Sequence, residues 1–206
     1  MAEKKNQHYV PQFHLKNFSI NGGRKIIGLF NIPSNKFIGN KARIKHQCAG
    51  DWFYGKDLIL ENALEYVETL TSSILKKIIN SSYFPPRFSE EHRVLISFVC
   101  LLSARTKYNE EATNDSIDGF LKHIMSFANE FTDDKKYTKE VLDKFKIRAK
   151  NAIHLSLETA IEITPLLNDL KYVLLLNETS LSFWTSDNPV VFYNQLLSTG
   201  QKRIDI

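Results

Sequence analysis

The spacing of apolar residues predicts a long amphipathic helix from Leu58 to Asn80. Its apolar positions recur at the period of one helix face, and they are Leu60, Leu64, Val67, Leu70, Ile74 and Ile78. Acidic residues near the start and two lysines near the end match the helix dipole. We therefore expect one face of this helix to pack against a core.

A second helix is predicted after Pro85 and Pro86, with Ser89 as its N-cap. Its apolar residues are so dense that it should be nearly surrounded, and they are Val94, Leu95, Phe98, Val99, Leu101 and Leu102. A third helix carries Ile117, Phe120, Leu121, Ile124 and Ala128. A fourth, capped by Thr138, carries Val141, Leu142, Phe145, Ala149, Ala152 and Ile153 toward a stop or kink at Pro165.

Short β elements are predicted on both sides of these helices. The N-terminal part should contain a short helix from Pro11 to Phe18, strands at Arg24 to Asn31 and Lys36 to Gly39, and an irregular connection from Ile44 to Gly55. The C-terminal part contains strand-like runs at Tyr172 to Asn177, Leu181 to Thr185 and Val190 to Tyr193. The predicted fold is α+β and mainly helical, with about four principal helices and a small sheet or hairpins from the two terminal segments.

Composition is typical of one compact domain spanning residues 1–206, since 43% of the residues are hydrophobic and 24% are charged. No apolar run is long enough for a membrane helix and the first residues are polar, so we expect a cytoplasmic protein without a membrane partner. Cys48 and Cys100 have no metal-type spacing and should be free, inert thiols. The formal charge of +4 is compatible with nucleic acid or another phosphate-containing ligand, although many basic proteins bind neither.

Two polar and aromatic motifs lie near opposite ends of the chain, at His8 to Phe18 and at Phe183 to Val191. Each places ionisable side chains beside a proline, which fixes φ and removes a backbone donor. This arrangement indicates a polar site. No nucleophile elbow, phosphate-binding glycine loop, zinc motif or dinucleotide fingerprint accompanies it, so the commonest acyl-transfer, nucleotide-hydrolysing and dehydrogenase classes are excluded at the level of motifs.

Several motifs together resemble a bacterial family called domain of unknown function 4238. They are His8 to Pro11 followed by Leu15 and Phe18, Asp51 to Tyr54, Leu60 and Glu61 with Glu68, Ser103 to Thr106, and Thr185 to Val191. The resemblance runs from about Gln7 to Tyr193. Family members usually continue through another stretch of strand, which leaves open a missing C-terminal part here. The resemblance implies no established reaction.

Arg105 is a candidate site residue because its charge falls on the apolar face of the second helix. A buried guanidinium needs an anionic partner, since an unpaired buried charge costs several kcal/mol. We expect that partner to be Glu61, Glu68 or Asp187. A structural ion pair and a contact to a ligand phosphate are both open at this point.

Glu61, Glu65 and Glu68 lie along one face of the first helix. Oxygen ligands of this kind suit Mg²⁺ or Mn²⁺, and Glu61 and Glu68 are the better candidate pair. A solvated acidic face is the alternative. His8 is the candidate general acid or base, and Asp187 could orient it or bind a metal.

Two hypotheses for function follow. In the first, the protein is a hydrolase, a nuclease-like phosphodiesterase with His8, Arg105 and Asp187 as catalytic residues and the amides Gln12 and Asn188 binding the substrate. In the second, the protein is a non-enzymatic binding module for nucleic acid or a protein partner, and the same groups form a structural network. Exposed cations around Lys135 to Lys150 would favour the second hypothesis.

Overall fold

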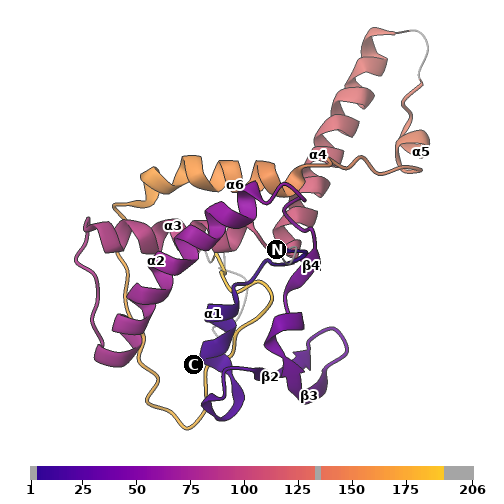
Figure 1. Ribbon diagram of the computed structural model, residues 1–206. Helices are drawn as coiled ribbons and strands as arrows, with labels where there is room; N and C mark the ends of the chain where they lie inside the picture. Colours follow the sequence, from indigo (N-terminus) through magenta and orange to yellow (C-terminus); the bar gives the residue numbers. More distant parts are fainter. Residues whose placement is uncertain (1–3, 133–135, 193–206) are drawn as a thin grey trace.

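Three helices form the body of the protein, with α3 in the middle (Figure 1). The computed structural model describes residues 4–132 and 136–192. Helix α3 (Glu90–Ala104) packs against α2 (Ile59–Ser81) on one side and α6 (Ala152–Ile163) on the other. The prediction of a central helix is confirmed, as is its cap, because Ser89 Oγ accepts a hydrogen bond from the backbone of His92 at 3.2 Å. The helix is not surrounded on every side, since Val99, one of its predicted core residues, is 43% exposed.

The core joins these helices to the N-terminal segment. Phe98, Leu101 and Leu102 of α3 are buried against Leu64 of α2 and Leu157 of α6. The N-terminal segment contributes further buried side chains to the same cluster, and these are Tyr9, Val10, Leu15, Ile27, Ile44 and Tyr54. The segment from Tyr9 to Tyr54 therefore contributes side chains to the core of the helices.

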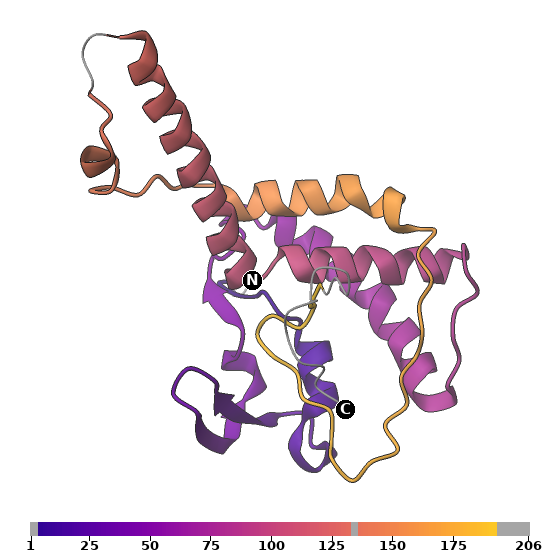
Figure 2. The same ribbon diagram turned by 180° about the vertical axis from the view of Figure 1, so that it is seen from behind.

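Helix α4 (Lys107–Ala128) starts against α6 and then continues beyond the body as an arm (Figure 2). The short helix α5 (Lys139–Leu142) lies beside the arm. No helix in the described part of the chain is both long and apolar enough to cross a membrane.

The single helix predicted from Thr138 to Pro165 is wrong. The chain forms α5 and α6 instead, with residues 143–151 irregular between them. Side chains of α4 explain the break, because Asp118 accepts a hydrogen bond from the backbone of Ile147 at 2.7 Å and Asn114 accepts one from Ala149 at 2.9 Å. These bonds satisfy backbone donors that a helix would otherwise satisfy internally.

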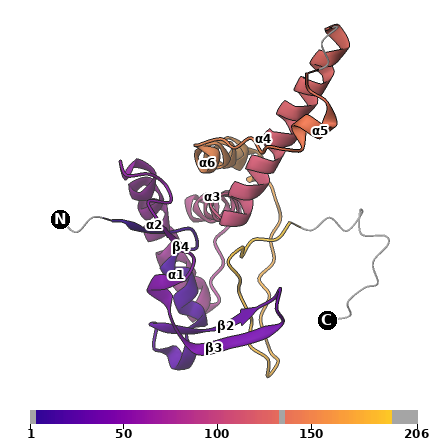
Figure 3. The same ribbon diagram turned by 90° about the vertical axis from the view of Figure 1, so that its right-hand side faces the viewer.

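Two small antiparallel sheets flank the helices. In the first, β1 (Asn6–His8) pairs with β4 (Ala49–Asp51). Strand β4 lies in the segment from Ile44 to Gly55, which we had predicted to be an irregular connection. In the second, β2 (Ile26–Asn31) pairs with β3 (Lys36–Arg43), which confirms the predicted hairpin and extends its second strand. The hairpin lies below the helices in Figure 3.

The short helix α1 (Gln12–Leu15) follows β1, within the segment predicted to be helical. Short 3₁₀ turns complete the regular secondary structure of the described residues, and they are η1 (Lys16–Phe18), η2 (Ile20–Gly22), η3 (Ile44–His46), η4 (Asn129–Phe131) and η5 (Thr164–Leu167). The predicted stop at Pro165 therefore coincides with a 3₁₀ turn after α6.

The predicted C-terminal strands are wrong for the described residues. Residues 168–192 contain no strand, and Tyr193 lies outside the described part. The segment is held by side chains instead, because the Tyr172 hydroxyl donates to the Pro85 carbonyl and the Trp184 ring meets Phe30 edge-on. Strand-forming side chains do not make a sheet where no neighbouring backbone pairs with them.

Core packing on α6 gives a direct test of the fold. We expect Leu157→Ala to lower the free energy of unfolding by about 2 to 5 kcal/mol, because Leu157 is fully buried and its removal leaves a cavity. Leu155→Ala is the matched control, since Leu155 lies on the same helix and is 38% exposed. Urea denaturation of the two variants measures the difference, and equal losses would contradict the packing described here.

Candidate functional site

Arg105 lies in the short turn between α3 and α4 and points back into the protein. It is 2% exposed. Its guanidinium donates from Nη1 to Glu68 Oε1 at 2.8 Å, from Nε to the Tyr54 hydroxyl at 2.9 Å and from Nη2 to the His8 carbonyl at 2.7 Å. The predicted pairing of Arg105 with a carboxylate is confirmed, and the partner is Glu68 of α2.

Tyr54 connects this ion pair to the N-terminal strand. Burial raises the pKa of Tyr54 to about 12, so its hydroxyl stays protonated and can both accept from Arg105 and donate to the His8 carbonyl. The backbone of Tyr54 donates to Gln7 Oε1 at 2.6 Å, and Gln7 Nε2 donates to the Gly55 carbonyl at 2.9 Å. Because Gln7 is fully buried, these bonds fasten β1 to the residues that follow β4.

The His8 side chain is half-buried, and its Nε2 has no hydrogen-bond partner in the described residues. Burial lowers its pKa, and the nearby charge of Arg105 acts in the same direction. The imidazole is therefore neutral at neutral pH, which suits a proton acceptor. No hydrogen bond joins His8 to Asp187 in the part of the chain that is described, so their shared site stays a prediction.

The two terminal motifs nevertheless meet. His14 Nε2 lies 3.0 Å from the Thr185 hydroxyl, and the Thr106 hydroxyl donates to Asn188 Oδ1 at 3.3 Å. Asn188 thus bonds the start of α4. Gln12, the other predicted substrate-binding amide, is partly buried at the first position of α1, and its role stays a prediction.

Asp187 is exposed and lies near Tyr9 and Cys48. Burial raises the pKa of Cys48 to about 11, and the charge of Asp187 adds to the shift. Burial raises the pKa of Tyr9 to about 12, and its neighbours Cys48 and Asp187 add to the shift. Both cysteines are free, as predicted, and Cys48 stays a protonated thiol at neutral pH.

The three glutamates of α2 have different neighbours. Glu68 pairs with Arg105 and Glu65 pairs with Lys4, whereas burial raises the pKa of Glu61 against the opposing charge of Arg105. No group of three or more His, Cys, Asp or Glu side chains in residues 4–132 and 136–192 is arranged to hold a metal ion. In the proposed metal pair, the Glu68 carboxylate is already bound by the guanidinium of Arg105. The described residues do not place Glu61 and Glu68 in a group of three possible ligands.

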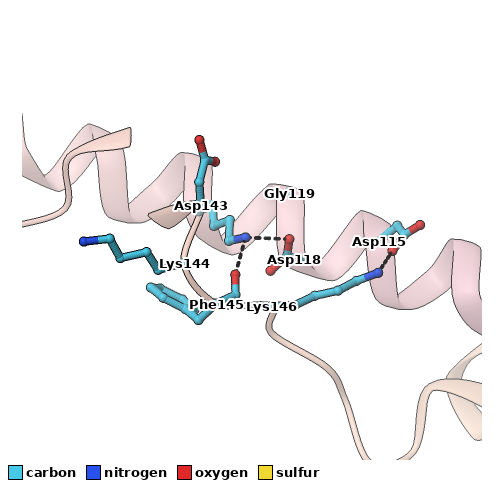
Figure 4. Close-up of a pocket in the computed structure, with 8 residues that line it drawn as sticks. Asp115, Asp118, Gly119, Asp143, Lys144, Phe145 and Lys146 are labelled. Carbon is cyan, nitrogen blue, oxygen red and sulfur yellow. Dashed lines mark hydrogen bonds and ion pairs between the residues drawn. The ribbon is translucent and has the colours of Figure 1, made fainter. Parts of the chain in front are cut away.

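Two hollows are not lined by the side chains of this network. One of about 540 Å³ is on the arm, where Lys122 pairs with Asp118 and Lys146 pairs with Asp115 (Figure 4). The other, of about 410 Å³, is lined by Lys5, Trp52, Lys56 and Leu58. None of the predicted catalytic residues lines either hollow.

A basic surface on the β2–β3 hairpin was missed by the motif analysis. Residues 16–50 contain no Asp or Glu and seven cations, which are Lys16, Arg24, Lys25, Lys36, Lys41, Arg43 and Lys45. We call residues 24–45 the basic hairpin. Its six cations are exposed, and none forms an ion pair with a described residue. The signal was the absence of acidic residues, which a search for motifs does not detect.

The fold and the network define a mainly helical α+β protein whose N-terminal strand is fastened to two helices by a buried arginine. The chain belongs to the family described as protein of unknown function (DUF4238), whose model matches residues 6–204. This confirms the resemblance seen in the motifs. No curated protein and no solved structure matches the chain.

The arginine network predicts a large effect of one substitution. We expect Arg105→Ala to lower the free energy of unfolding by about 3 to 5 kcal/mol, because it leaves Glu68 and the His8 carbonyl without their buried partner. Arg148→Ala is the control, since that ion pair with Glu111 is exposed and should contribute little. Chemical denaturation measures both, and a loss below about 1 kcal/mol in Arg105→Ala would contradict a structural role.

Burial of His14 predicts a pH dependence of stability. Burial lowers its pKa in the folded state below the unfolded value of about 6.5, so the unfolded chain takes up the proton first as the pH falls. Its contribution is therefore complete above about pH 6.5 and decreases below it. Between about pH 7.5 and 5.5, the parent should lose more stability than His14→Gln, which does not titrate. Equal losses in urea denaturation would show that His14 is not responsible.

Proposed function

We propose that the protein is a nucleic-acid-binding module in which the basic hairpin contacts the phosphates and the arginine network holds the fold. The observation that carries this proposal is the set of six exposed hairpin cations, which have no acidic residue among them in the sequence and no ion pair to a described residue. Unpaired lysines and arginines on one element bind polyanions, because each phosphate contact releases condensed counterions.

The arm, with residues 139–150 beside it, is the alternative basic surface, but part of its positive charge is neutralised, while Lys139, Lys144 and Lys150 form no ion pair with a described residue. Lys122, Lys146 and Arg148 each pair with an acidic residue of α4. Lys135 lies outside the described residues. Compared with the arm, the basic hairpin has more free positive charge to offer a phosphate backbone.

The phosphodiesterase hypothesis has weaker support. It requires Arg105 to reach a substrate phosphate, but the guanidinium is buried and donates to three protein groups. Its remaining support is the neutral His8, whose buried Nε2 is without a partner in the described residues. We therefore propose binding as the function, and cleavage becomes a second readout of the same experiment.

Fluorescence anisotropy with a labelled oligonucleotide tests the proposal. We expect Lys41→Glu/Arg43→Glu to weaken binding on the order of tenfold or more at low salt, and to reduce the slope of log K against log salt by about 2. Lys144→Glu/Lys150→Glu is the matched control, since it makes the same change in net charge on the arm. This control should keep most of the affinity.

The proposal is wrong if the parent does not bind the oligonucleotide, or if the two double variants lose equal affinity. Vesicles containing phosphatidylserine serve as a second probe, because cations beside exposed apolar residues also suit an anionic membrane. Binding to vesicles without binding to oligonucleotide would overturn the assignment to nucleic acid. Incubation with Mg²⁺ or Mn²⁺ tests cleavage, and loss of cleavage in His8→Gln would revive the phosphodiesterase hypothesis.

A further inference from the structure

Aromatic side chains share the outer face of the basic hairpin with its cations. Phe30 and Phe37 are directly opposite each other in the strand register. The Phe37 ring lies over Gly28, where a Cβ would be 3.7 Å from the ring. Because Ile27 and Leu29 on either side of Gly28 pack against the core, Gly28 and both rings belong to the face that points away from it.

Lys41 and Arg43 are on this same outer face. Both side chains are exposed, and Ala42 between them pairs with Ile27 and packs against the core. The strands shift register between this pair and the pair of Phe30 with Phe37. Two residues along a strand span about 7 Å, so the two side chains are close enough together to contact neighbouring phosphates of one extended strand. The two cations are thus placed for phosphates of one strand, beside rings placed for its bases.

The rings are accessible to a ligand. Phe37 is 63% exposed and Phe30 is 41% exposed, and Trp184 from the C-terminal segment, 77% exposed, meets Phe30 with the ring centroids 6.0 Å apart. Phenyl rings have no hydrogen-bonding groups with which to read base edges. Their chemistry instead suits stacking on the faces of unpaired bases.

We infer that the basic hairpin binds single-stranded nucleic acid, with bases stacked on Phe37 and Phe30 and phosphates bound by Lys41 and Arg43. This inference rests on the proposed nucleic-acid-binding function and specifies its ligand. A duplex keeps its base faces inside the stack, so it can use the cations of this surface but not the rings.

The test compares a single strand with the duplex of the same sequence, using the whole chain. We expect Phe37→Ala to weaken single-strand binding on the order of tenfold and to leave duplex binding nearly unchanged. Phe37→Tyr should restore the single-strand affinity, because a phenol ring still stacks. Ile38→Ala is the matched control, since Ile38 is 62% exposed beside Phe37 but has no ring.

The possible failures separate the inference from the proposed function. Equal weakening of single-strand and duplex binding in Phe37→Ala, or an equal loss in Ile38→Ala, overturns stacking, while dependence on Lys41 and Arg43 keeps the binding function. Failure of the parent to bind either form overturns both. Circular dichroism of each variant excludes unfolding as the cause, and Trp184→Ala gives a second stacking variant on a different segment.

Discussion

The buried charge of Arg105 is the constraint on which the rest of the structure depends. A guanidinium taken out of water must have its charge compensated and its donors bonded, and no single element of this protein does both. Helix α2 supplies the carboxylate, the residues after β4 supply the phenol, and β1 supplies a backbone carbonyl. Since a missing partner would leave part of the cost uncompensated, these elements hold their relative positions together. Arg105 and the backbone of His8, from two of the three candidate catalytic residues, are thus members of this scaffold.

The helices could be predicted because an amphipathic period is a local property. In α2 and in α3, the spacing of apolar residues within one stretch of chain indicates which side chains are buried. The break between α5 and α6 could not be read in this way, because the groups that replace its helical hydrogen bonds are Asn114 and Asp118 of another helix. The C-terminal strands failed for a related reason, since a strand exists only with a partner.

Part of the site could be predicted, because the need to compensate a buried charge can be seen in the sequence. A charge on an apolar face demanded an anionic partner, which identified Arg105 and restricted its partner to a few residues. The carbonyl of His8 could not be anticipated, because every residue carries a carbonyl and only the fold selects one. The basic hairpin was visible in principle, yet the net charge of +4 averages it with acidic stretches elsewhere. Local charge, counted over tens of residues, is the more useful quantity here.

The network also has a consequence for how the chain folds. The bond from Arg105 to the His8 carbonyl closes a separation of 97 residues, and the contact between His14 and Thr185 closes one of 171. Contacts so distant in sequence raise the contact order, and folding slows when loops of this size must close before their contacts form. During synthesis the N-terminal strand emerges first but cannot complete these contacts until α3 and then the C-terminal segment have left the ribosome. Its final docking is therefore a late event, completed after the helices are made.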